Sequence, residues 1–196
     1  FEYLRDSQHC AACDQGYKPT ANFSTCELIP EQYINYDNPW AISALTVATV
    51  GIMLTLGVFY IFLVNTDTPV IKAAGRELSY VLLLGTFMEF SMTYVMVAPP
   101  TELSCTVIRF FLGFCYTLCY AAVVTKTNLI SRIFNSGVQS MKKPRYTSPK
   151  SQLLITFMLT SVQVVINCIW FLFDQPRVTL IYPTPDTKLR ICAGLG

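Results

Sequence analysis

The residues best able to do chemistry are cysteines near the start of the chain. Cys10-Ala-Ala-Cys13 has the spacing of a redox pair or of half a zinc site, and Cys26 follows in a polar, turn-rich stretch. Neither a redox site nor a zinc site has further support, because the sequence has no second CxxC motif and predicts no helix directly after Cys13. The only histidine, His9, is expected to be solvated. The segment favours disulfide bonds, and no metal or cofactor is expected.

Charged side chains inside apolar runs are the second group of interest. Glu89, Arg109 and Lys126 each interrupt such a run, and charges within a membrane usually face the interior of a helix bundle. At 1.5 Å of rise per residue, Glu89 and Arg109 both lie roughly 10 Å below the outer surface. We hypothesise that these two side chains pair; the alternative is an independently hydrated Glu89. Lys126 lies about 9 Å before Arg132 along its helix, where it can snorkel to water.

The composition points to a membrane protein and against several other classes. The 196-residue chain is 53% hydrophobic and 13% charged, whereas soluble domains carry about 25% charged residues. The net charge of +2 and the lack of a basic-aromatic strip give no support for nucleic-acid binding. The sequence contains no glycine-rich phosphate loop and no recognisable catalytic arrangement, so an enzyme is not expected.

Four apolar runs are long enough to cross a bilayer, which takes about 20 residues. Because backbone groups in lipid must bond to one another, these runs should be helices. The first run follows the cysteine segment, so it is not a signal peptide, and the chain is expected to be a fragment or a mature product. The runs are Trp40–Val64, Leu78–Ala98, Val107–Ile133 and Leu153–Phe173.

Lysine and arginine in the connecting loops predict the orientation. The loop 65–77 holds Lys72 and Arg76, and the loop 132–150 is basic without any acidic residue, whereas the loop 99–106 has neither lysine nor arginine. Basic loops stay in the cytoplasm. The N-terminus, the second loop and the tail after Phe173 are therefore predicted to lie outside, and the sequon at Asn22 agrees as a glycosylation site.

The outer cysteines suggest one disulfide directly. Cys105 opens the third helix and Cys192 lies beyond the fourth, both at the outer rim, so they can pair. Closing so long a loop contributes about 4 kcal/mol in the entropic account. Three outer cysteines then remain, an odd number, so one of them needs a partner elsewhere. The cysteines within helices (Cys115, Cys119 and Cys168) are expected to be apolar filler.

Three blocks of sequence resemble class C G-protein-coupled receptors. "CAACDQGYKPTANFSTCELIPEQYI" looks like the end of their cysteine-rich domain, and "NTDTPVIKAAGRELSYVLLLG" resembles their first cytoplasmic loop and second helix. "YAAVVTKTNLISRIF" with "KPRYTSPKSQ" resembles the third helix and second cytoplasmic loop, in the form of the metabotropic glutamate receptor branch. The resemblance covers almost the whole chain.

The resemblance implies an all-α membrane protein: a partial seven-transmembrane bundle behind a small disulfide-rich extracellular segment. Residues 1–37 would end the cysteine-rich domain and its linker. Residues 38–196 would hold helices at about 40–64, 78–98, 105–133 and 152–173 and the start of the second extracellular loop. The domain that binds the agonist and helices five to seven would lie outside this chain. The expected location is the plasma membrane, with several passes and the N-terminus outside.

The resemblance also implies roles for particular residues. Cys13 would pair with Cys26, Cys10 with a cysteine upstream, and Cys105 with Cys192. Lys126 would form an inactive-state lock with an acidic residue of helix six and would lack a partner within this chain. An allosteric pocket for small molecules would be lined by Gly85, Glu89, Arg109, Leu112, Cys115, Tyr116 and Tyr120. Family members have a small residue where Glu89 stands, so its carboxylate would change the polarity of that pocket.

The expected partners are a heterotrimeric G protein, membrane lipid, an amino-acid agonist (glutamate or a related amino acid) and a second receptor in a dimer. The resemblance implies that the basic loop 132–150 contacts the G protein. The expected contacts are Arg132, Lys142, Lys143, Arg145 and Lys150. The alternative is that these cations only set the topology and contact lipid.

Two rival classes remain: a four-helix membrane organiser or adhesion protein, and a transporter or channel subunit. The first usually has a cysteine-rich loop between its last two helices, where this chain has a basic loop without cysteine. The second would need broken helices or polar linings, and two of the four runs carry no charge.

Overall fold

A computed structural model of the chain describes residues 2–6, 9–14, 16–22, 24–69, 71, 75–139, 148–184 and 187–193, with the backbone alone at 2–6, 9–12 and 135–139. The predicted contacts Lys142, Lys143 and Arg145 lie outside these residues. So does the side chain of Cys10.

Within the described residues, four helices are long and apolar enough to cross a membrane. They are α1 (Pro39–Val64), α3 (Arg76–Val97), α4 (Glu102–Gln139) and α5 (Pro149–Phe173). The fold is therefore the helical membrane bundle predicted from the sequence.

Several helices begin or end at residues other than those predicted. Asn38 caps α1 by accepting a hydrogen bond from the Trp40 N–H at 3.2 Å. Pro149 lies before the predicted start of the fourth helix at about residue 152, yet it stands in the first turn of α5, where a missing N–H costs nothing. At the other side of this loop, α4 continues to Gln139 rather than ending near 133. The loop is thus shorter than expected.

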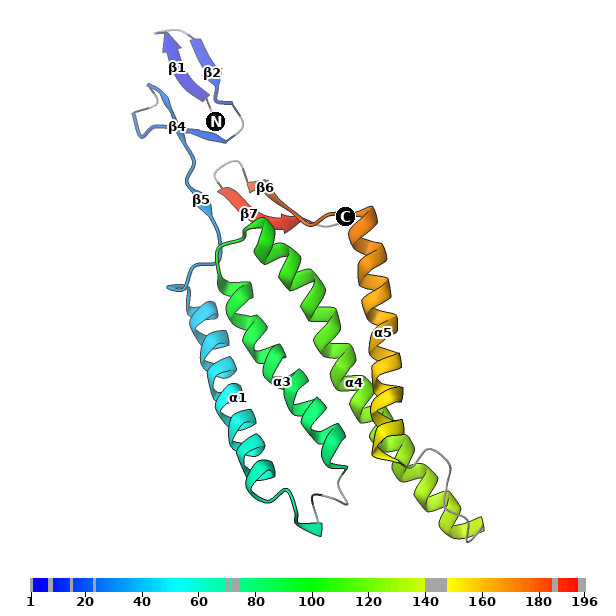
Figure 1. Cartoon of the computed structure of the whole chain (residues 1–196). Coiled ribbons are helices and arrows are strands. Elements are labelled where there is room, and N and C mark those ends of the chain that lie inside the picture. The colour runs from blue at the N-terminus through cyan, green and yellow to red at the C-terminus, as the bar shows by residue number, and fades with distance from the viewer. Residues whose placement is uncertain are drawn as a thin grey trace.

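The helices pack in chain order, with α3 between α1 and α4, and α5 against α4 (Figure 1). Glycines permit two close approaches. A Cβ on Gly51 would lie 2.5 Å from the Phe90 ring, and one on Gly85 would lie 2.6 Å from the Cys119 Sγ. These contacts fix α3 against both of its neighbours.

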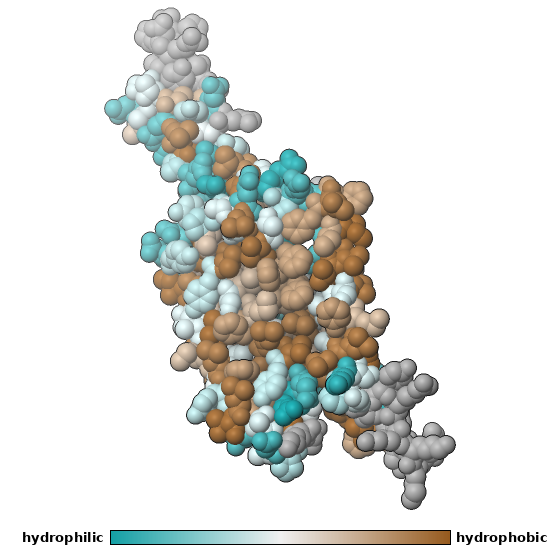
Figure 2. Space-filling model, viewed as in Figure 1, coloured by the Kyte–Doolittle hydropathy of each residue, from teal (hydrophilic) through white to brown (hydrophobic). Residues whose placement is uncertain are grey.

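Much of the helical surface is apolar and exposed. Trp40 on α1 and Leu172 and Phe173 on α5 are each more than 80% exposed, and Figure 2 shows hydrophobic side chains across the middle of the bundle, with hydrophilic ones gathered toward its ends. A water-soluble protein rarely exposes so large an apolar area. The surface fits a bundle that lies in lipid.

The segment before α1 contains two small hairpins. In the first, β1 (Glu2–Asp6) pairs with β2 (His9–Ala12), and in the second, β3 (Tyr17–Pro19) pairs with β4 (Cys26–Leu28), both antiparallel. A disulfide joins Cys13 to Cys26, the pair implied by the resemblance. The second hairpin also carries an exposed ion pair between Lys18 and Glu27 at 3.1 Å.

A further sheet lies at the same end of the bundle as this segment and was not predicted from the sequence. After α5 the chain forms a hairpin of β6 (Arg177–Thr184) and β7 (Thr187–Ala193), and β5 (Glu31–Gln32) adds to it on the far side of β7 (Figure 1). The sheet therefore joins the segment before α1 to the segment after α5.

Candidate functional site

Among the described residues, the contact between β5 and β7 is the only backbone pairing between the segment before α1 and the tail after α5. The two strands are parallel, with Glu31 opposite Lys188 and Gln32 opposite Leu189. We call β5, β7 and the disulfide that anchors β7 the junction. So short a strand is not stable by itself, so side chains must hold it.

Ion pairs supply this support. The Lys188 Nζ lies 3.0 Å from the Glu31 Oε1, and the Arg190 Nη1 lies 3.7 Å from the Glu31 Oε2. The hydrogen bond from Lys188 and its charge, with a smaller contribution from Arg190, hold the pKa of Glu31 below its ordinary value against the effect of desolvation. The side chain of Lys188 is buried, with 11% exposed. A buried cation needs such a partner.

A disulfide anchors β7 to the bundle. Cys105 in the first turns of α4 is joined to Cys192 in β7, with the Cα atoms 5.5 Å apart, and Cys105 is buried. This is the pair expected from the position of both residues at one rim. Together with the ion pairs, it gives a continuous path from β5 through β7 into α4.

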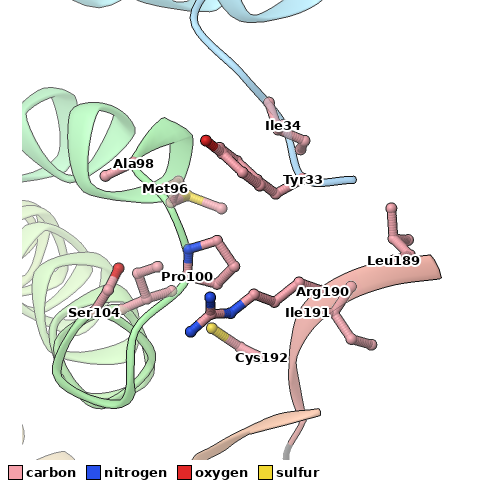
Figure 3. A pocket seen from close by; sticks show the side chains of 11 residues that line it. Tyr33, Ile34, Met96, Ala98, Pro100, Ser104, Leu189, Arg190, Ile191 and Cys192 are labelled. Carbon is pink, nitrogen blue, oxygen red and sulfur yellow. The ribbon is translucent and has the colours of Figure 1, made fainter. Parts of the chain in front are cut away.

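A cavity of about 210 Å³ lies between the junction and the neighbouring ends of α3 and α4. Figure 3 shows the guanidinium of Arg190 extending from β7 toward Pro100, and Tyr33 lies on the other side of Pro100. The cavity is lined by Tyr33, Ile34, Met96, Ala98, Pro100, Ser104, Ile108, Leu189, Arg190, Ile191 and Cys192.

The predicted pair between Glu89 and Arg109 is wrong. The Arg109 Nη2 lies 3.7 Å from the Asp174 Oδ2, and its guanidinium stacks 4.8 Å over the Trp170 ring. The physical reason is the face of α4 on which Arg109 lies: a Cβ on Gly113, one turn further along, would lie 2.9 Å from the Gln163 side chain of α5. Arg109 therefore faces α5 and not α3.

Glu89 lies on the opposite interface, between α3 and α4. It stands one turn after Gly85, the residue in close contact with Cys119, and its side chain lies beside the Cys119 thiol. The Glu89 Oε1 is buried and has no hydrogen-bond partner among the described residues. Such an oxygen is costly, and among the described residues it is the one buried side-chain oxygen or nitrogen without a hydrogen-bond partner.

Lys126 has a partner within this chain, contrary to expectation. Its Nζ donates a hydrogen bond to the Ser79 Oγ at 3.4 Å, which links α4 to α3. Ser79 is buried and bonds in turn to the Gly75 carbonyl oxygen at 3.2 Å. The lysine is thus directed toward α3 within the bundle.

The residues expected to line an allosteric pocket lie in three surroundings. Gly85, Glu89 and Cys115 lie at or beside the interface of α3 and α4. Arg109 lines a separate cavity of about 370 Å³ against α5. A stripe along α4 is exposed on the described helices and consists of Leu112, Tyr116 and Tyr120.

The other predicted sites lie at the two ends of the bundle. Asn22 is exposed in a turn of the second small hairpin. Arg132 and Lys150 are exposed at the end of the bundle away from the junction, and the Arg132 Nε donates a hydrogen bond to the Asn128 Oδ1 at 3.2 Å.

Sequence analysis missed Glu31, Lys188 and Arg190. The signal present was alternation: Lys188 and Arg190 are separated by one apolar residue, as on one face of a strand. The acid that pairs with them lies so far away in sequence that no local pattern connects the two.

Comparison with known proteins agrees with the architecture. Residues 34–195 match the family described as "7 transmembrane sweet-taste receptor of 3 GCPR". Over 174 residues, 89% of the chain, the sequence is 45% identical to metabotropic glutamate receptor 4 of Mus musculus. Over 182 residues, 93% of the chain, it is 42% identical to metabotropic glutamate receptor 8 of Homo sapiens.

The chain therefore belongs to the class C family of G-protein-coupled receptors and is a multi-pass membrane protein. It spans about a fifth of the length of the curated relatives that it matches, 19% and 20% respectively. These relatives are receptors and not enzymes.

Proposed function

We propose that the chain is the part of a glutamate-type receptor that carries a signal from the extracellular domain to heterotrimeric G proteins. The names of the relatives support glutamate, or a related amino acid, as the agonist. Residues 1–37 then end the cysteine-rich domain and 38–196 form the transmembrane part, with the N-terminus outside the plasma membrane. The agonist binds in a part of the receptor upstream of this chain.

The junction is the observation that carries this proposal. A signal that arrives through the cysteine-rich segment can reach the bundle along the covalent linker to α1, or across β5 and β7 into α4. The second path contains an ion pair at 3.0 Å, in which Lys188 is buried and Glu31 is exposed, and a disulfide. Movement of the segment before α1 therefore displaces the end of α4. A purely organising protein would have no need of such a rigid connection.

At the opposite end, exposed cations support contact with a G protein. Arg132 lies in the last part of α4 and Lys150 in the first turn of α5, the two helices that the basic loop connects. Lys142, Lys143 and Arg145 lie in the segment between them. Lys126 acts as the inactive-state lock by way of an acidic residue of another helix. In the structure its ammonium lies at the α3–α4 interface on Ser79, so activation requires only a change of partner.

The exposed stripe of α4 supports the allosteric pocket. Leu112, Tyr116 and Tyr120 present apolar and aromatic surface on the face that the four described helices leave uncovered. In a seven-helix bundle this surface contributes to a pocket for small molecules, with Glu89 and Arg109 near its edges. A dimer of receptors is part of the same proposal.

The proposal is tested by reversing one charge at the junction. Glu31→Lys places a third cation beside Lys188 and Arg190, so glutamate-stimulated GTPγS binding to a co-expressed G protein should fall about tenfold in potency or be lost. Glu27→Lys is the matched control, because Glu27 pairs with Lys18 within one hairpin and does not reach the bundle.

Equal responses of both variants and the unmodified receptor, at equal surface expression, would contradict a signal path through the junction. Ion flux in response to glutamate without nucleotide exchange would instead favour a channel subunit.

A further inference from the structure

The cavity beside the junction is partly open, and its walls are parts of the chain that other contacts hold in place. The first wall is formed by Tyr33 and Ile34, which follow β5. The second is formed by Pro100, before α4, and Ser104, in the first turn of α4. The last wall is β7 (Figure 3). The strand pairing fixes the first wall and the disulfide fixes the last. Its shape is therefore preformed, which is typical of ligand sites.

The charge that lines this cavity comes from one side chain. Arg190 is the one charged side chain among the described residues that line the cavity. Glu31, the acid nearest to it, is already bonded to Lys188 at 3.0 Å, and its distance of 3.7 Å to Arg190 is too long for a hydrogen bond. Two cations thus face one carboxylate. No side-chain hydrogen bond joins Arg190 to another described residue, so its planar fork of donors is open to an anion.

The remaining walls are apolar, with two hydroxyl groups. Met96, Pro100 and Ile108 line the same cavity as Arg190, and the hydroxyls belong to Tyr33 and Ser104. A volume of about 210 Å³ is below the range of roughly 300–1,000 Å³ for drug-sized ligands. The occupant must therefore be small and must combine an anionic group with an apolar body.

We propose that this cavity binds a small organic carboxylate, with the carboxylate on the Arg190 guanidinium and the apolar body against Met96, Pro100 and Ile108. Guanidinium and carboxylate match each other in plane and in donor spacing, which favours a carboxylate over an inorganic anion. Because the walls belong to both sides of the junction, the ligand joins the linker to the bundle. The further expectation that this ligand alters the response to agonist rests on the proposed function.

The test uses the purified full-length receptor in phosphatidylcholine nanodiscs and two fluorinated probes of equal shape. By ¹⁹F NMR, 3-(4-fluorophenyl)propionate should bind saturably and 3-(4-fluorophenyl)propanamide should not. Arg190→Gln should weaken binding of the acid by about tenfold or more, the usual effect of losing a charged hydrogen bond. Arg177→Gln is the matched control, because Arg177 is an exposed arginine of the same hairpin that does not line the cavity.

A second variant keeps the test independent of folding. Met96→Trp fills the cavity from the exposed end of α3 without changing any charge, and it should abolish binding of the acid. Peptide mapping without reduction should show the Cys105–Cys192 disulfide in each variant. Equal binding of acid and amide, an equal loss in Arg177→Gln and Arg190→Gln, or no saturable binding would overturn the site. Binding without any change in the glutamate response would leave the site standing and remove its link to signalling.

Discussion

At the junction, Glu31 faces two cations, whereas in the membrane interior Glu89 has a buried carboxylate oxygen without a hydrogen-bond partner among the described residues. The junction satisfies the carboxylate of Glu31 within this chain. The interior satisfies its charges incompletely, with Lys126 on a neutral hydroxyl, and the family's seven-helix bundle has further helices that can contribute partners. The difference indicates that the junction is a structural connection, while the interior charges are available to change partners.

The largest expected effect comes from removing the anchor of the junction. Cys105→Ser or Cys192→Ser should lower the free energy of unfolding by about 2–5 kcal/mol, because without the disulfide the unfolded chain is no longer constrained. Thermal unfolding of the purified receptor measures this loss. Cys168→Ser should have no such effect, because Cys168 is a free, exposed cysteine; an equal loss in that control would assign the effect to something other than the disulfide.

The interior should be sensitive to added volume where α3 and α4 touch. Gly85→Ala places a Cβ about 2.6 Å from the Cys119 Sγ and should destabilise the bundle by about 1–3 kcal/mol through overpacking. Adding Cys119→Ala removes the sulfur and should restore most of the loss, as measured by unfolding in mixed micelles. Equal stability of the single and the double variant would show that this contact does not limit packing.

A smaller effect is expected for the charged side chains at the α4–α5 and α3–α4 interfaces. Arg109→Gln and Asp174→Asn should show a coupling of about 0.5–1 kcal/mol in a double-mutant cycle, because their side chains are in contact. Arg109→Gln and Glu89→Gln should be additive within about 0.5 kcal/mol. Coupling in the second cycle and none in the first would reverse the assignment of faces made here.

The smallest expected effect concerns the pH dependence of the junction. The pKa of Glu31 is lowered by its bond to Lys188, so its stabilising contribution is present above the ordinary pKa of a carboxyl and is lost as the pH falls through the lowered value. Lys188→Met should raise the pKa of Glu31 toward its ordinary value. A carboxyl-selective ¹³C NMR titration measures this, and an unchanged midpoint would show that Lys188 is not the cause.

The helices of this chain were predictable because lipid leaves few alternatives. Runs without charge, such as those that became α1 and α5, must be helical in a membrane, and the rim positions of Cys105 and Cys192 suggested their disulfide. The ends of the helices were less predictable: Pro149 reads as a breaker in a loop, yet it starts α5 because the first turn tolerates it.

The contacts of the charged side chains were not predictable, because depth in the membrane does not give the face of a helix. Glu89 and Arg109 lie at similar predicted depths but on different interfaces of α4. The pairing of Glu31 with Lys188 depends on a parallel contact between segments at opposite ends of the chain, for which a single sequence holds no local signal.

The most direct test of the account is a cross-link between the two strands of the junction. Gln32 and Leu189 are opposite each other in β5 and β7, so the pair Gln32→Cys and Leu189→Cys should form a disulfide in the receptor on intact cells, detected by peptide mapping without reduction. The shifted pair Tyr36→Cys and Leu189→Cys should remain reduced. Free thiols in the first pair, or equal cross-linking in both, would contradict the connection between the segment before α1 and the bundle.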